Sequence, residues 1–336
     1  MNILVTGGLG YLGSHAVVEL ARQNYKVLIV DNLSNSHKKN LKNLEKIIGQ
    51  KVIFYEEDIR DKTKLEIIFK KNNISGIMHF AGLKSVKKSN TEKKEYFDVN
   101  VRGTENLVSV FNDARQDEKF FIFSSSACVY GNPDYLPYDE KHNLQPQNYY
   151  GQTKLEAELL LKNTYLNKKN WKIIILRYFN PLGAHHSYLI GDKSLGKPEN
   201  LMPNIINSVS SKKERLQIFG FNYDTSDGTP VRDFIHVEDL INGHVLALNY
   251  LKKTKKKIYE IFNLGTGKGL SVLELIKAFE ETNDIRVPFE FVKERKGDLP
   301  IYFSSAKKIA KKLEWKAKLT VKDMCKSSWE FYKNNK

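Results

Sequence analysis

Residues 1–31 read MNILVTGGLGYLGSHAVVELARQNYKVLIVD, and the rest of the chain can be read outward from this stretch. A short apolar run at residues 2–6 leads directly into a glycine-rich turn, residues 7–13, with the spacing GxxGxxG. An amphipathic segment, residues 14–23, and a second apolar run follow, and the stretch stops at Asp31. This order predicts a dinucleotide-binding βαβ unit, which consists of a strand, a glycine turn, a helix, a second strand and an acidic residue.

Each of these residues has a physical reason to stand where it does. Gly7 lets the chain turn tightly out of the strand, and Gly13 lets the helix pack closely on the sheet. Gly10 lets backbone amides approach a pyrophosphate at the positive end of the helix. Asp31 would accept hydrogen bonds from the adenosine ribose hydroxyls and repel a 2′-phosphate. The sequence therefore predicts NAD as cofactor, in preference to NADP.

Alternation of strands and helices continues through the first half of the chain. Strands are expected at 52–55, 76–79, 120–123 and 172–176, with helices ending near 48, at 62–71, at 94–114 and from 149 onward. This spacing predicts an α/β fold with a doubly wound parallel sheet. Gly, Pro and Asn become frequent from Pro181. We therefore predict an NAD-binding Rossmann-like domain over 1–180 and a smaller substrate-binding domain over 181–336, with strands near 231–264 rejoining the main sheet.

Composition is ordinary for a globular protein, with 41% hydrophobic and 28% charged residues among 336. No apolar run approaches the ~20 residues that span a bilayer, and the chain begins directly with a strand. A cytoplasmic protein with no membrane partner is expected. The two cysteines form no disulfide framework, and the adjacent pair His185–His186 is interpreted as non-ligating, so no metal is expected.

The net charge of +15 raises the question of nucleic-acid binding. Lysines are spread along the chain, however, and the densest run, residues 252–257, falls between an expected helix and strand. No nucleic-acid-binding motif accompanies the charge. A lysine-rich solvated surface accounts for it, so no nucleic-acid partner is expected.

Tyr150 and Lys154 form a YxxxK motif, which places both side chains on one face of a helix. A free tyrosine titrates near ~10 and is a poor base at neutral pH, but an ammonium one turn away favours the phenolate. Such a tyrosine could take a proton from a hydroxyl as hydride leaves the same carbon. The same spacing recurs from Tyr165 and from Tyr332, so the motif alone is weak.

Context separates the three copies. Only Tyr150 follows, by one loop, a strand that opens onto three serines ending at Ser126. Ser126 would share a hydrogen bond with the substrate hydroxyl. We therefore predict Ser126, Tyr150 and Lys154 as the catalytic residues.

Further motifs carry a resemblance to a known family. They include VTGGLGYLGSH (5–15), HFAGLK (79–84), SSSA (124–127), LRYFNP (176–181), NLMP (200–203), RDFIHV (232–237) and GDLP (297–300). With these motifs the chain resembles the UDP-glucose 4-epimerases, a family among the extended short-chain dehydrogenases/reductases, from Met1 to about Glu330. The resemblance implies reversible inversion at C4 of a UDP-hexose, UDP-glucose or UDP-galactose, through a 4-keto sugar, with bound NAD and Tyr150 as acid and base.

The resemblance also implies contacts, residue by residue. For the cofactor these are Gly7, Gly10, Tyr11, Leu12, Gly13, Asp31, Asn32, Leu33, Ser34, Asn35, Ser36, Asp58, Ile59, Phe80, Ala81, Gly82, Leu83, Lys84, Asn100, Ser126, Tyr150, Lys154 and Phe179. For the nucleotide sugar they are Ser126, Tyr178, Asn180, Asn200, Leu201, Phe219, Arg232, Arg295, Asp298 and Tyr302. A diphosphate needs cationic partners, and arginine's planar fork suits phosphate, which agrees with Arg232 and Arg295. Relatives commonly form homodimers through the helices near 94–111 and after 150, and we expect the same here.

Two alternatives remain at this point. The nearer is a nucleotide-sugar 4,6-dehydratase or a related NAD-dependent sugar-nucleotide enzyme on the same fold. Dehydratases typically carry an acid pair after the serine position, where this chain has Ala127-Cys128-Val129. The other is a non-catalytic NAD(P)-sensing protein, although such proteins commonly lose the tyrosine or lysine that this chain keeps.

Overall fold

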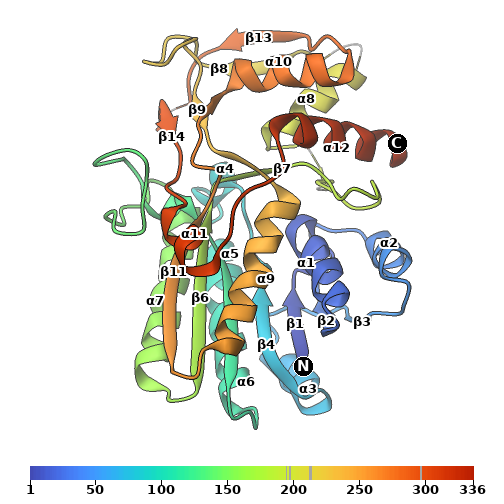
Figure 1. Cartoon of the computed structure of the whole chain (residues 1–336), viewed down its shortest axis with the longest axis vertical. Helices are drawn as coiled ribbons and strands as arrows, with labels where there is room; N and C mark the ends of the chain where they lie inside the picture. Colours follow the sequence, from blue (N-terminus) through green and yellow to red (C-terminus); the bar gives the residue numbers. More distant parts are fainter. Residues whose placement is uncertain (194, 197, 212–213, 296) are drawn as a thin grey trace. The chain divides into compact units, whose positions relative to one another are not determined.

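The computed structural model describes residues 1–193, 195–196, 198–211, 214–295 and 297–336 (Figure 1). The chain divides into two compact units. The first unit comprises residues 1–131, 143–178 and 241–262, and the second comprises 132–142, 179–240 and 263–336. The chain therefore passes back and forth between the units, whereas the sequence predicted a boundary near residue 180, with strands near 231–264 returning to the first domain.

A seven-stranded sheet forms the centre of the first unit. Its strands are β1 (Asn2–Thr6), β2 (Lys26–Val30), β3 (Ile53–Tyr55), β4 (Ile74–His79), β5 (Lys119–Ser126), β6 (Trp171–Tyr178) and β11 (Ile258–Leu264). The strand order is β11-β6-β5-β4-β1-β2-β3, and β3, β2, β1, β4, β5 and β6 pair in parallel. Read from β3, this is the order of a dinucleotide-binding fold. The predicted doubly wound α/β class is confirmed.

Helices alternate with these strands, as Figure 1 shows. They are α1 (Tyr11–Arg22), α2 (Lys39–Ile48), α3 (Lys62–Lys71), α4 (Val86–Ser89), α5 (Lys93–Phe97), α6 (Gly103–Asp113), α7 (Tyr149–Asn167) and α9 (Val237–Lys253). Helix α7 starts where it does because the Asn148 side chain accepts a hydrogen bond from the Gly151 amide at 2.8 Å.

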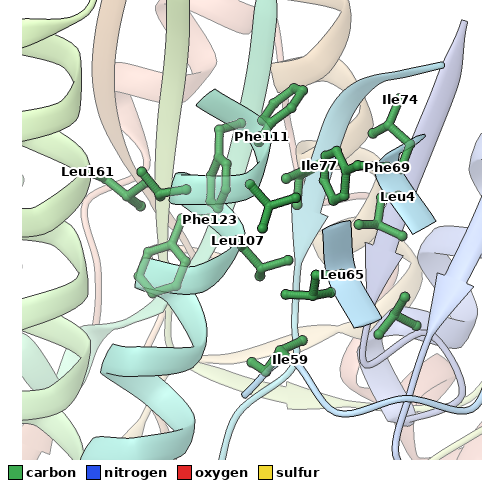
Figure 2. Packing of buried hydrophobic residues seen from close by; sticks show 14 of the residues in the cluster. Leu4, Ile59, Leu65, Phe69, Ile74, Ile77, Leu107, Phe111, Phe123 and Leu161 are labelled. Atoms are coloured by element: carbon green, nitrogen blue, oxygen red, sulfur yellow. The ribbon is translucent and has the colours of Figure 1, made fainter. Parts of the chain in front are cut away.

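Figure 2 shows the core between the sheet and three of these helices. Leu65 of α3, Leu107 of α6 and Leu161 of α7 are fully buried, and they belong to one cluster with Leu4 and Phe123 of the sheet. Strands β1 and β2 are apolar on both faces, which is the pattern of a parallel sheet covered on both sides. This packing fixes α7 against β5 and β6, the strands that carry the serines.

One expected helix is interrupted. The sequence predicted a continuous helix over 94–114, but residues Asp98–Arg102 form a π-helical turn between α5 and α6. π-Turns insert one extra residue into a helix, and periodicity alone does not reveal them. The turn carries Asn100, whose side chain is buried.

The second unit is built from shorter elements. Its strands are β7 (Asn180–Leu182), β8 (Leu216–Phe219), β9 (Val231–Arg232), β10 (Phe234–His236), β12 (Leu270–Ser271), β13 (Phe289–Val292) and β14 (Ile301–Tyr302). Its helices are α8 (Leu201–Ser210), α10 (Val272–Asn283), α11 (Lys307–Leu313) and α12 (Val321–Asn334). Ile205, Leu275 and Phe279 are fully buried at the centre of its own core.

The prediction that residues 231–237 rejoin the main sheet is wrong. β9 pairs with β12 and β14, and β10 pairs with β7. These strands have two or three residues each, so their partners depend on tertiary contacts that a local pattern does not encode. β11, in contrast, takes its place beside β6 at the edge of the seven-stranded sheet. Among the described residues, no helix is both long and apolar enough to cross a bilayer.

Candidate active site

The glycine turn joins β1 to α1 through very close backbone contacts. Gly7 has a φ of +67°, and a Cβ there would lie 2.8 Å from the Ala81 nitrogen. A Cβ at Gly13 would lie 2.1 Å from the Gly7 oxygen. A Cβ at Gly10, in contrast, meets only the Gly7 oxygen, at 3.2 Å, and Gly10 is the N-cap of α1. Few atoms therefore crowd Gly10 at the amino end of α1, where the predicted pyrophosphate contact would lie.

Asp31 lies at the end of β2 and is nearly buried. One of its oxygens accepts a hydrogen bond from the Leu9 amide at 2.9 Å. The other accepts from the Leu33 amide at 2.9 Å and from the Ser36 hydroxyl at 2.8 Å. A carboxylate offers about four acceptor positions, so acceptor capacity for a ribose hydroxyl remains. These contacts order the predicted cofactor segment 32–36 around the acid.

Asp58 belongs to a second predicted part of the cofactor site. It accepts hydrogen bonds from the Arg60 guanidinium at 2.7 and 3.0 Å and from Asn32 at 2.7 Å. Burial works against its ionisation, but the hydrogen bonds from Arg60 and Asn32 outweigh it and lower the pKa of Asp58 to about 2. Asp58 is thus an anion joined to the 32–36 segment.

Asn100 holds the loop of residues 80–84 in place. Its amide oxygen accepts from the Leu83 nitrogen at 2.8 Å, and its amide nitrogen donates to the Leu83 oxygen and to the Thr153 hydroxyl, both at 3.0 Å. The π-turn therefore ties the loop after β4 to helix α7. The structure gives Asn100 a positioning role, and its direct cofactor contact stays a prediction.

The structure brings Ser126, Tyr150 and Lys154 together within the first unit. The Ser126 hydroxyl hydrogen-bonds the phenol of Tyr150, and the Lys154 Nζ lies 5.9 Å from the centre of the Tyr150 ring. The same Nζ donates to the Ser124 carbonyl at 2.9 Å. All three predicted side chains are less than a tenth exposed. A serine hydroxyl, a phenol and a lysine amine therefore share one buried site, an arrangement that suits proton transfer.

Burial sets the protonation of this group. It raises the pKa of the Tyr150 phenol well above its ordinary value, and it lowers the pKa of Lys154 to about 8, against the charge of Glu158. Phenolate formation at Tyr150 therefore depends on positive charge held nearby. The ammonium of Lys154 supplies such a charge.

The second copy of the motif lies in a different setting. Tyr165 packs against Tyr259 at 5.5 Å, with the Lys257 Nζ 4.4 Å from its ring centre. Lys169 lies beyond the end of α7 at Asn167. Tyr165 and Lys169 therefore do not share a helical face.

Tyr178, predicted to contact the sugar, lies in the first unit at the end of β6. Its hydroxyl is 2.7 Å from the Ser124 hydroxyl. Burial raises the pKa of Tyr178 to about 12, although the Ser124 hydrogen bond opposes the rise. Tyr178 is a neutral phenol at the same edge of the sheet as Ser126, the predicted catalytic serine.

Predicted substrate residues of the second unit converge on strands β9 and β14, where Tyr302 pairs with Arg232. The Arg232 guanidinium donates to the Leu299 carbonyl at 2.8 Å and forms an ion pair with Asp298. The Tyr302 ring packs between Tyr138 at 4.8 Å and Phe179 at 5.1 Å.

A second pair is built on β8. The Arg295 guanidinium stacks on the Phe219 ring at 3.8 Å. Asn200 is the N-cap residue of α8 and donates to Asp192 at 2.8 Å, while Leu201 begins that helix. Asn180 opens β7, and its amide donates to the Asp233 carbonyl at 3.0 Å.

Two sets of polar residues were not predicted from the sequence. Tyr223 interacts electrostatically with Arg232, Arg295 and Asp298, so it lies among the predicted substrate residues. Glu158 and Arg177 form a buried ion pair beside Lys154. Two features of the sequence could have indicated this pair. Glu158 stands four residues after Lys154, and Arg177 follows the apolar residues of β6.

His185, His186 and Glu238 are a group that could hold a metal ion, with donor atoms within 4.8 Å of one another. Glu238 accepts from the His186 Nδ1 at 2.7 Å, and the Ser187 amide donates to the His185 Nδ1 at 3.1 Å. An imidazole that accepts at Nδ1 carries its proton on Nε2, which leaves no lone pair there for a metal. We therefore interpret these contacts as hydrogen bonds around the Glu238 carboxylate. The absence of a metal stays a prediction.

Comparison with known proteins places this site in a family. The family model for the NAD dependent epimerase/dehydratase family matches residues 3–265. The chain belongs to that family. It is 44% identical to the UDP-glucose 4-epimerase of Dictyostelium discoideum, over 99% of this chain and 96% of that protein.

Solved structures agree. The UDP-glucose 4-epimerase of Stenotrophomonas maltophila, solved with NAD and formylated UDP-arabinopyranose, gives a TM-score of 0.95 at 43% identity and covers 100% of this chain and 98% of that one. The enzyme of Bifidobacterium longum, in complex with NAD+ and UDP, gives 0.94 at 40% identity, covering 100% and 99%. The likeness extends over both units of the chain.

Proposed function

We propose that this protein is a UDP-glucose 4-epimerase that interconverts UDP-glucose and UDP-galactose with bound NAD. The observation that carries the proposal is the set of Ser126, Tyr150 and Lys154 at the end of β5, in a chain similar over its whole length to enzymes of that name. The same similarity speaks against the 4,6-dehydratase alternative.

The residues of the first unit fit NAD. Gly10 leaves space at the amino end of α1, Asp31 keeps acceptor capacity beside it, and Asn100 orders the loop after β4. NAD supplies reversible hydride acceptance from C4. Segments 7–13, 31–36 and 80–84 would hold it.

This chain's own residues move the proton. Tyr150 accepts the proton of the 4-hydroxyl while Ser126 hydrogen-bonds that oxygen, and the Lys154 ammonium stabilises the phenolate. Inversion requires the 4-keto sugar to present its other face before it is reduced. The nucleotide end must therefore be held firmly and the hexose loosely, which agrees with Arg232 and Arg295 as diphosphate anchors.

The deciding experiment gives the purified protein UDP-galactose and no added cofactor, and follows the products by NMR. We expect UDP-glucose to accumulate to an equilibrium mixture, and acid-denatured protein to release NAD and not NADP. A 4-keto-6-deoxy sugar nucleotide would support the dehydratase instead, and stoichiometric consumption of added NAD would support a dehydrogenase. The absence of any turnover would support the remaining alternative, a non-catalytic NAD(P)-sensing protein.

We propose that Tyr302 excludes N-acetylated substrates. Its ring is fixed between Tyr138 and Phe179, so it forms a rigid wall. The resemblance leads us to expect this position beside the sugar's C2 substituent, where a tyrosine would leave no room for an acetamide. Tyr302→Cys should gain turnover of UDP-N-acetylgalactosamine and keep that of UDP-galactose, measured in competition. Equal turnover of both by the parent protein would show that Tyr302 does not control this choice.

We propose further that the protein is a homodimer that joins through α7 and the neighbouring helices. Leu159 and Leu166 lie on α7 and are 54% and 64% exposed. Exposed leucines on a helix next to the active site suit an interface between copies. Light scattering should give twice the chain mass, and Leu159→Lys with Leu166→Lys should give the monomer. A parent protein with the mass of one chain would contradict the proposal. A cytoplasmic location stays a prediction.

A further inference from the structure

A buried ion pair lies one helical turn beyond Lys154. Glu158 and Arg177 are 2% and 1% exposed. The Arg177 Nε donates to one Glu158 oxygen at 2.9 Å, and Nη2 donates to the other at 2.5 Å. Replacing a buried ion pair by apolar residues is often neutral or stabilising. Stability alone therefore does not account for this pair.

Its surroundings relate it to the proton-transfer residues. Tyr150, Lys154 and Glu158 are spaced by four, so they lie on three successive turns of α7. Each of them forms a hydrogen bond with one of three consecutive serines of β5. The Ser126 hydroxyl bonds Tyr150, and the Ser124 carbonyl accepts from Lys154 at 2.9 Å. The Ser125 hydroxyl donates to Glu158 at 2.5 Å. Glu158 thus completes one row of contacts between the helix and the strand.

We propose that Glu158, oriented by Arg177 and Ser125, is a positioning residue that holds Lys154 as an ammonium beside Tyr150. The inference rests on the proposed function, in which Lys154 stabilises the Tyr150 phenolate. Arg177 holds the Glu158 carboxylate in place through two hydrogen bonds, and its own guanidinium is stacked 4.9 Å from the Tyr130 ring centre.

The charges around Lys154 support this assignment. Burial lowers the pKa of Lys154 to about 8, and the charge of Glu158 is the contribution that raises it. From β5 the ammonium meets the Phe123 ring at 4.9 Å and the Ser124 carbonyl, neither of which is ionised. From β4 it meets His79, whose pKa burial lowers to about 3, so His79 is neutral.

From α7 itself Lys154 meets Tyr150, whose phenol is also neutral at ordinary pH because burial raises its pKa. On β6 the charged group is Arg177, which forms its ion pair with Glu158. Loss of the Glu158 charge would remove the contribution that raises the pKa of Lys154, which favours a neutral lysine.

The test is Glu158→Gln, which keeps the shape of the side chain and removes its charge. In the pH profile of kcat for UDP-galactose, the high-pH limb is the fall in kcat as the pH rises. We expect this limb to lie about one pH unit lower in the variant, with KM and bound NAD unchanged. The ultraviolet difference absorbance of tyrosinate, taken against Tyr150→Phe, should show that the Tyr150 phenolate forms at higher pH. A merely structural role would lower kcat equally at every pH and leave the limb in place.

Matched variants complete the design. Glu156→Gln removes a charge from the same helix, where Glu156 accepts from Gln152 at 3.1 Å, and should leave the profile unchanged. Glu158→Asp should restore the limb. If Glu158→Gln does not fold, E158Q/R177M leaves no unpaired buried charge and should still move the limb to lower pH, because the Glu158 charge is absent.

A profile of Glu158→Gln that superimposes on that of the parent would overturn the inference. Failure of the proposed function would give a different result from failure of this inference. It would appear as a parent protein without epimerase activity, and the tyrosinate titration would still test the pair.

Discussion

Tyr150→Phe should lower kcat for UDP-galactose by about 10²- to 10⁴-fold, the range for loss of a general acid–base group. The change removes one oxygen that bonds Ser126 and keeps the ring, which is 7% exposed. Bound NAD and the free energy of unfolding should therefore stay close to those of the parent. Stopped assays of product by NMR, with NAD measured after acid release, check both parts.

The control for this variant is Tyr165→Phe. Tyr165 belongs to the second YxxxK copy and packs against Tyr259, away from any serine of β5. Its removal should leave kcat within a factor of about two, as for a substitution away from the site. A large loss at Tyr165 with little at Tyr150 would overturn the site assignment.

Gly13→Ala should disrupt the fold, whereas Gly10→Ala should disrupt only the cofactor site. The new Cβ at position 13 would lie 2.1 Å from the Gly7 oxygen and 2.8 Å from the Gly8 Cα, and backbone atoms cannot move aside. We expect a loss of about 3 kcal/mol in the free energy of unfolding, measured in urea, as for severe overpacking.

Gly10→Ala is the matched comparison, because its Cβ meets only one atom, at 3.2 Å. The variant should fold with a stability within about 1 kcal/mol of the parent. It should lose bound NAD, since a methyl group would fill the space at the amino end of α1. If Gly13→Ala has the same free energy of unfolding as the parent and keeps NAD, the close packing of the turn is not required for the fold.

The local parts of the site were predictable because their chemistry lies in short stretches of sequence. Gly7 and Asp31 flank β1 and β2, whose bounds, Asn2–Thr6 and Lys26–Val30, match the predicted runs. Tyr150 and Lys154 follow from a spacing of four on one helix. In each case the residues involved are close in the chain or at ends of adjacent parallel strands.

What was missed depends on contacts between distant residues. Val231 of β9 pairs with Ser271 and Ile301, which lie 40 and 70 residues further along the chain. The π-turn at Asp98–Arg102 inserts one residue in an otherwise periodic helix. Arg177 looks like a surface charge at the end of a strand until the burial of Glu158 is known.

The place of β11 beside β6 has a consequence for how the chain folds as it leaves the ribosome. β6 is almost wholly buried, with the apolar centre Ile173-Ile174-Ile175-Leu176, and β11 covers its outer edge. That partner begins only at Ile258, so the isoleucine-rich edge stays open while residues 179–240 of the second unit are made. Lys172 and Arg177 flank the open stretch, and charges at such positions discourage pairing with another chain. We therefore expect these two residues to disfavour aggregation of the nascent protein as well.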